Sequence, residues 1–159
     1  MTTETWHSLH LYLHSETEDT DRFLLREAAP LLDRLTAPGG AAASWFFIRY
    51  GEDGPHLRIR VHGLSAPAAV DLAQELARAA KEVPAVPGPW PSRHGEVREV
   101  PYVPETERYG GPRALPVAEE VFAASTQVAL DALRDLHAAA AAAAPGPSRL
   151  KKRHSPPHK

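Results

Sequence analysis

The segment of residues 45–63 constrains the fold more than any other part of the chain. Two runs rich in apolar residues flank the turn residues Glu52-Asp53-Gly54-Pro55, and this pattern predicts a β-hairpin. Its second half, residues 56–62, alternates strictly between apolar and polar side chains. Successive residues of a strand face opposite sides of a sheet, so one side of this strand can be buried. The apolar side consists of Leu57, Ile59 and Val61, and the polar side consists of His56, Arg58, Arg60 and His62.

This polar side concentrates four groups that are cationic or can become cationic. Neighbouring like charges repel each other and gain little from packing, so an anionic ligand would account for the arrangement better than solvent does. Two arginines two residues apart suit a carboxylate or a phosphate, because each guanidinium offers a planar fork of donors. One alternative stays open at this point. Arg58 and Arg60 could pair with acidic side chains of the same chain, such as Glu105 or Glu107, and only satisfy the sheet.

Three helices are predicted outside the hairpin. The first is about four turns long and follows the Glu16–Asp21 cluster, with Pro30 predicting a kink or a division into two parts. The second has Ser65 as its N-cap, and the third begins near Pro116. We expect buried stripes formed by Val70, Ala73, Leu76, Ala77 and Ala80 in the second helix and by Val121, Phe122, Val128, Ala129, Ala132, Leu133 and Leu136 in the third.

Two further strands complete the pattern, one at residues 6–14 and one from about Glu96 to Val103. The order strand, helix, strand, strand, helix, strand, helix predicts an α+β fold, namely a ferredoxin-like split βαββαβ antiparallel sheet with an additional C-terminal helix. In that topology the first and third strands are neighbours at the centre of the sheet, so their polar sides merge. The merged face is expected to carry His10, Tyr12, His14, His56, Arg58, Arg60 and His62, with Arg49 or its neighbours nearby on the edge strand.

Composition indicates one domain. A chain of 159 residues with 43% hydrophobic residues can build a single core, and we expect a domain at residues 1–144 and a basic, disordered tail at residues 145–159. The sequence contains no apolar run long enough to span a membrane and no signal-peptide pattern at its start, which predicts a cytoplasmic protein. The absence of cysteine excludes disulfides and thiolate metal sites.

The charge distribution excludes further classes of ligand. The net charge of −2 becomes −7 when the five cations of residues 145–159 are left out, so the body is acidic and unlike a nucleic-acid-binding domain. The tail itself is expected to be a solvated end, with tRNA contact as a less favoured alternative. Arginines between the histidines oppose a divalent cation, so no metal site is expected.

Several blocks of the sequence resemble the thiopeptide-type bacteriocin biosynthesis domain. These blocks are residues 46–50, 56–60 and 102–111, and the opening strand at Trp6 and the helix at residues 118–125 also match. The resemblance covers roughly residues 5 to 136. This family includes the C-terminal glutamate-elimination domain of nisin-type lantibiotic dehydratases and the stand-alone cycloaddition enzymes that close the pyridine ring of thiopeptides.

The resemblance implies a role in the maturation of a ribosomally made peptide. In such dehydratases a separate domain glutamylates Ser or Thr of a precursor peptide from glutamyl-tRNA, and the elimination domain removes the α-proton and expels glutamate. Arg58, Arg60 and Arg108 would then grip the glutamyl group. Glu105 would orient them or share in proton transfer, and no cofactor is implied. The residues expected to contact substrate are His10, His14, Arg49, His56, His62 and Tyr109, and a histidine is the default base.

The chain departs from the family pattern after its last helix. Full-length members continue with a histidine-containing segment that furnishes a catalytic group, so this sequence is expected to represent the N-terminal half of the domain. His137 is expected to be a surface residue or a partner of the helix dipole. Three functions stay open: a lyase subunit of a split dehydratase working with a companion subunit or as a homodimer, a non-catalytic subunit that binds precursor peptide or enzyme, and a pyridine-forming cycloaddition enzyme.

Overall fold

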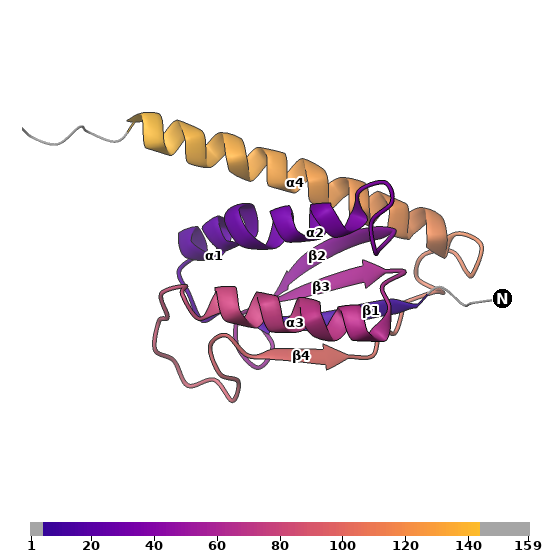
Figure 1. The fold of residues 1–159 in the computed structure, drawn as a ribbon, viewed down its shortest axis with the longest axis horizontal. Helices are drawn as coiled ribbons and strands as arrows, with labels where there is room; N and C mark the ends of the chain where they lie inside the picture. The colour runs from indigo at the N-terminus through magenta and orange to yellow at the C-terminus, as the bar shows by residue number, and fades with distance from the viewer. Residues whose placement is uncertain (1–4, 144–159) are drawn as a thin grey trace, which may run out of the picture.

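The computed structural model describes residues 5–143 of the chain (Figure 1). The expected tail at residues 145–159 lies outside the described residues. In chain order the elements are β1 (Trp6–Tyr12), α1 (Thr17–Phe23), the π-helical turn η1 (Leu24–Ala28), α2 (Ala29–Thr36), β2 (Ser44–Tyr50), β3 (His56–His62), α3 (Ala66–Ala80), β4 (Val97–Val100) and α4 (Leu115–Ala143).

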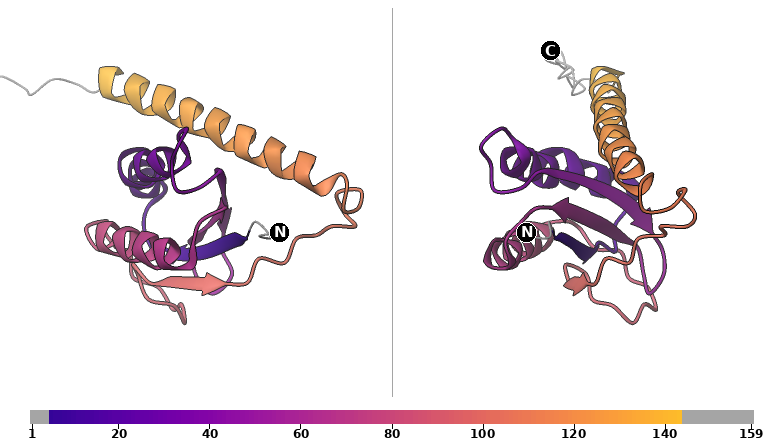
Figure 2. Two further views of the ribbon diagram at one scale, coloured as in Figure 1. Left: turned by 45° about the vertical axis from the view of Figure 1, so that its right-hand side comes forward. Right: turned by 90° about the vertical axis from the view of Figure 1, so that its right-hand side faces the viewer.

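The four strands form one antiparallel sheet in the order β2-β3-β1-β4 (Figure 1). The two helical segments that follow β1 and β3 pack against one face of this sheet, and the long α4 runs along the edge strand β2 (Figure 2). This is the split βαββαβ arrangement with an additional C-terminal helix. The predicted α+β, ferredoxin-like fold is therefore confirmed.

The core lies between the sheet and the helices. Leu57, Ile59 and Val61 of β3 are at most 1% exposed, as the alternation of residues 56–62 predicts. Apolar side chains from every helix close over them, because removing apolar surface from water is the main favourable contribution to folding. The other large buried members of this core include Leu9, Leu11, Leu13, Phe23, Leu24, Leu32, Leu72, Leu76 and Leu130.

Local signals explain how two of the helices begin. Pro30 lies in the first turn of α2, where a missing N–H is tolerated, and η1 immediately precedes it. The first predicted helix is thus divided into two parts by a π-helical turn. Ser65 caps α3 as predicted, since its side chain accepts a hydrogen bond from the backbone N–H of Ala68.

Two predicted buried stripes are partly wrong. Val70 of α3 is 50% exposed, and the buried positions of that helix are Ala69, Leu72, Leu76 and Ala80. In α4 the buried residues are Thr126 and Leu130, whereas Val121, Val128 and Leu136 are more than half exposed. Alanine and valine occur on nearly all sides of α4, and its packing against β2 and η1 covers a narrow stripe. The strand β4 is shorter than predicted because Pro101, which lacks an N–H, follows Val100.

Candidate functional site: a cationic sheet face

The face of the sheet that points away from α1, α2 and α3, called the open face below, collects polar side chains from four strands. The register places Ser8 opposite Arg60, His10 opposite Arg58 and Tyr12 opposite His56 across β1 and β3. On the other side of β1, His10 also faces Arg98 of β4. The residues of this face are Trp6, Ser8, His10, Tyr12, Ser44, Phe46, Ile48, Tyr50, His56, Arg58, Arg60, His62, Arg98 and Val100.

Arg58 is held in place by its neighbours on the open face. Its guanidinium carbon lies 3.5 Å from the centre of the Tyr50 ring, which is a close cation–π contact. Its Nε donates a hydrogen bond of 3.1 Å to Nε2 of His56, while Nδ1 of His56 lies 2.9 Å from the carbonyl oxygen of Gly54. In this arrangement Nε2 of His56 accepts from Arg58, and its Nδ1 faces the Gly54 carbonyl. The nearest carboxylate is that of Glu52, an exposed turn residue 3.7 Å away.

Arg60 lies deeper and has no carboxylate partner among residues 5–143. Its guanidinium carbon is 4.9 Å from the ring centre of Tyr102 and 5.7 Å from that of Phe46. Its buried Nε has no hydrogen-bond partner in the part of the chain that the structure describes. Burial lowers the pKa of Arg60 from its usual range, and nearby Tyr102 partly offsets this effect. A half-buried, uncompensated cation is costly unless an anion can reach it.

His10 occupies the middle of the open face. Its ring stacks on that of His56 with 5.2 Å between centres. Burial, followed by the charges of Arg58, His56, Arg60 and Arg98, lowers the pKa of His10 to about 4. The imidazole is therefore neutral at neutral pH.

The segment between β4 and α4 folds against one end of the open face. The Tyr102 ring is 5.4 Å from Trp6, which in turn stacks on His62 at 4.6 Å. The Tyr102 hydroxyl donates a 2.9 Å hydrogen bond to Glu119, and burial together with this bond raises the pKa of Tyr102. The Tyr109 ring contacts Phe122 edge-on, 5.1 Å away. Tyr102 of this aromatic cluster also contacts Arg60.

Glu105 and Arg108 lie in the same segment but are exposed. Arg108 forms a 3.0 Å ion pair with Glu105, three residues earlier, and no contact joins either residue to Arg58 or Arg60 within the described part of the chain. The structure thus brings His10, His56, Arg58, Arg60 and His62 together on one face. Tyr109 lies at the border of that face, through its contact with Phe122.

His14 lies beyond the end of β1, in a buried network rather than on the open face. Its Nε2 is 2.8 Å from the hydroxyl of Ser92, which donates to the carbonyl of Asp53. Its backbone N–H donates to Nδ1 of His94. Burial and the nearby His94 lower the pKa of His14. The geometry indicates that His14 ties the proline-rich loop before β4 to the turn of the hairpin.

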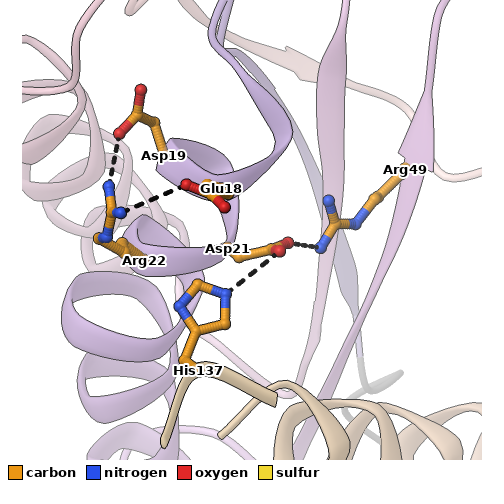
Figure 3. A network of polar contacts seen from close by, with 6 residues as sticks. All are labelled: Glu18, Asp19, Asp21, Arg22, Arg49 and His137. Atoms are coloured by element: carbon orange, nitrogen blue, oxygen red, sulfur yellow. Dashed lines mark hydrogen bonds and ion pairs between the residues drawn. The ribbon is translucent and has the colours of Figure 1, made fainter. Parts of the chain in front are cut away.

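Arg49 lies on the opposite side of the sheet from Arg58 and Arg60. The register pairs it with Leu57, so its side chain faces the helices and forms an ion pair with Asp21 of α1. The other oxygen of Asp21 lies 3.3 Å from Nε2 of His137 in α4 (Figure 3). Arg49 itself therefore does not lie on the merged polar face, and its neighbours Ile48 and Tyr50 are the edge-strand residues that do. His137, expected as a surface residue or a partner of the helix dipole, contacts Asp21.

Arg98 is a member of the open face that the sequence interpretation missed. It lies on β4 opposite His10 of β1, and its guanidinium carbon is 4.8 Å from the Tyr12 ring centre. Its Nε donates a 2.8 Å hydrogen bond to Glu96. The alternation of residues 97–100 could have revealed its position, because it places Arg98 and Glu99 on opposite faces of the sheet.

Among residues 5–143 there is no group of three histidine or acidic side chains that could hold a metal ion. Nor does that part of the chain contain a helix suited to crossing a membrane.

Comparison with known proteins gives a family for the chain. The family model described as "Lantibiotic biosynthesis dehydratase C-term" matches residues 6–148. The crystal structure of TsrL is 28% identical with a TM-score of 0.57, over 84% of this chain and 35% of TsrL. The tRNA-dependent lantibiotic dehydratase MibB from Microbispora sp. 107891 is 28% identical with a TM-score of 0.61, over 81% of this chain and 12% of MibB.

A third structure shares the fold at lower identity. The pyridine synthase TbtD from thiomuracin biosynthesis has a TM-score of 0.63 and 18% identity, over 84% of this chain and 49% of TbtD. The chain thus spans less than half the length of each of these three proteins. Among curated proteins, none matches the sequence. Because the family model covers nearly the whole chain, the protein belongs to the lantibiotic biosynthesis dehydratase C-terminal family.

Proposed function

We propose that the chain acts in the maturation of a ribosomally made peptide, and that its open face binds the carboxylate of a glutamylated Ser or Thr residue during glutamate elimination. Family membership and the similarity to a lantibiotic dehydratase support the reaction class. The unpartnered Arg60 beside Arg58 is the observation that carries the site. Its uncompensated charge and its free Nε would be satisfied by a carboxylate entering between the two guanidinium groups.

The proposed step is a β-elimination. A base takes the α-proton of the glutamylated residue, a carbon–carbon double bond forms, and the bond to the glutamyl oxygen breaks with release of glutamate. Negative charge develops on the substrate carbonyl and on the leaving carboxylate. Arg58 and Arg60 are held by aromatic contacts and His56 before any ligand arrives, so little reorganisation is needed to stabilise that charge.

A companion subunit or a second copy of the chain would complete this site. Glu105 and Arg108 pair with each other and make no described contact with Arg58 or Arg60. Catalysis with a partner is the first candidate function.

A non-catalytic, peptide-binding subunit is the second candidate. The same separation of Glu105 and Arg108 from the two central arginines favours it, because all four residues would need to act together in elimination. In this case the open face holds an acidic segment of the precursor peptide without turnover, and its affinity depends on salt.

Mass spectrometry of glutamate release tests the proposal. Glutamylated precursor peptide is incubated with the full chain alone, and with a candidate companion dehydratase subunit. Release of glutamate by the chain alone supports a self-sufficient lyase. Release only in the presence of the partner supports a split lyase. Peptide binding without release in both arms supports the accessory subunit.

Arginine variants connect the outcome to the open face. Arg58→Gln and Arg60→Gln are expected to lower glutamate release at least about tenfold, or to weaken peptide binding by a similar factor. The matched control is Arg78→Gln, because Arg78 is an exposed arginine of α3 on the other side of the molecule. Unchanged release and binding in both open-face variants would refute the anion site.

A further inference from the structure

His10 stands between cations on both sides. It lies on β1, one of the two central strands, and the register places Arg58 of β3 on one side and Arg98 of β4 on the other. Neither ring nitrogen has a hydrogen-bond partner among the described residues, although the ring stacks on His56. An imidazole with two free nitrogens in the middle of a cationic face is available to a ligand.

The groups facing His10 are strongly unbalanced in charge. From β3 it meets His56, Arg58 and Arg60, and from β4 it meets Arg98. Tyr12, its neighbour on the same face of β1, offers a phenol ring and no carboxylate. The carboxylates nearest to these cations, Glu52 and Glu96, lie at the rims, where each pairs with one arginine. Glu99 of β4 points to the helix side and contacts His7.

These neighbours make protonation of His10 unfavourable while the face is empty. The burial of His10 and the four surrounding groups hold its pKa at about 4. A bound anion reverses the electrostatic contribution, because its negative charge attracts the proton that the arginines repel. The proton also turns His10 into a second donor toward that anion.

We propose that His10 is a positioning residue of the carboxylate site that takes up a proton as the anion binds, so that the open face binds anion and proton together. This inference rests on the proposed function and adds a regulation by pH to it. A neutral His10 avoids placing another cation on the empty face. A protonated His10 adds a charge-assisted hydrogen bond when the substrate carboxylate is present.

The sign of the pH effect follows from linkage. Proton uptake on binding means that anion affinity rises as the pH falls, and the rise ends near pH 4, where His10 of the free chain is itself protonated. Each unit by which the anion raises the pKa of His10 corresponds to a tenfold difference in anion affinity between the protonated and neutral forms. We expect a rise of at least one unit.

Sulfate is a suitable probe because its charge stays constant between about pH 4 and 8. Nuclear magnetic resonance of the histidine ring carbons gives the pKa of His10 in the full chain, in sulfate and in chloride of equal ionic strength. The chloride arm removes general screening of the arginines as an explanation. We expect the pKa of His10 to rise in sulfate relative to chloride. The ring-carbon signals of His137, on the helix side, serve as the control and should be the same in both salts.

Calorimetry and a variant provide the second measurement. Sulfate binding to the wild-type chain is expected to take up protons, seen as different heats in buffers of different ionisation enthalpy. His10→Gln is expected to abolish this uptake and to make sulfate affinity nearly independent of pH, whereas His137→Gln leaves both as in the wild type. The wild-type titration stands even where His10→Gln fails to fold.

The outcomes separate the two proposals. In one outcome, sulfate binding depends on Arg58 and Arg60, but the pKa of His10 is equal in sulfate and chloride. This result overturns the role of His10 and leaves the carboxylate site intact. In another outcome, sulfate does not bind, and Arg58→Gln and Arg60→Gln leave glutamate release or peptide binding unchanged. This result overturns both the role of His10 and the carboxylate site. A raised pKa of His10 with proton uptake that disappears in His10→Gln supports the inference.

Discussion

The two faces of the sheet treat their arginines in opposite ways. On the helix side, Arg49 is paired with Asp21, which also contacts His137, so three elements share one charge-balanced network (Figure 3). On the open face, Arg60 has no carboxylate partner within residues 5–143, and Arg58 has an exposed one at 3.7 Å. The charges between the packed elements are balanced by partners within the chain, which offsets the cost of taking them partly out of water. Charges left unbalanced on the open face are what a binding site for an anion requires.

The helix side should carry the stability of the chain. Replacing the fully buried Ile59 with alanine removes several core methyl groups and leaves a cavity. We expect Ile59→Ala to lower the free energy of unfolding by about 2–5 kcal/mol, measured by chemical denaturation. The control is Val128→Ala, because Val128 is 69% exposed, and the expected change is within about 0.5 kcal/mol. Equal effects of the two variants would contradict the assignment of the core.

The balanced network should have the next largest effect. Asp21→Asn removes the charge that joins Arg49 of β2 to His137 of α4, and the Asp21 side chain is 11% exposed. Because Arg49 and His137 remain partly accessible to water, we expect a loss of about 1–3 kcal/mol in the free energy of unfolding. Asp131→Asn breaks an exposed pair with Arg134 and should cost at most about 0.5 kcal/mol. If Asp21→Asn matches Asp131→Asn, the network contributes nothing specific.

Strict alternation made part of this comparison predictable. Leu57, Ile59 and Val61 could be assigned to one face because β3 is polar on the other, and the antiparallel topology then placed His10 beside Arg58. The strand β2 has aromatic or apolar residues on both faces, so its pattern gave no orientation for Arg49. The position of His14 depends on Ser92, 78 residues away, through a loop closure that no local pattern encodes. On α4, small apolar residues on all sides concealed which stripe meets β2.

The open face should make stability depend on pH. In the folded chain the pKa of His10 is about 4, against 6.5 as its ordinary value, so the unfolded chain binds more protons between these limits. Stability contributed by neutral His10 is therefore present above about pH 6.5 and is lost as the pH falls toward 4. The full shift corresponds to roughly 3 kcal/mol, and solvent screening at the partly open site reduces it to about 1–2 kcal/mol.

The measurement is the difference in unfolding free energy between the wild type and His10→Gln, followed from about pH 7 to 4 by urea denaturation. The difference isolates His10, since other groups that titrate in this range, such as His14, are common to both proteins. A constant difference across the range would mean that His10 is not held neutral by its neighbours.

Arg60 provides the sharpest test of the two faces, because its loss should barely change stability while it strongly reduces glutamate release or peptide binding. Replacing it with glutamine removes a half-buried cation that lacks a partner, which favours the folded state, and also removes cation–π contacts with Tyr102 and Phe46, which disfavours it. These contributions have similar size, so we expect the free energy of unfolding to change by less than about 1 kcal/mol. Glutamate release, or peptide binding, should fall at least about tenfold.

Arg49→Gln should give the reverse pattern, a measurable loss of stability with little direct effect on the anion site, because its charge is already balanced by Asp21. A stable Arg60→Gln variant with full binding would mean that an unpaired arginine on this sheet is tolerated without a ligand, and the contrast between the two faces would then have no functional meaning.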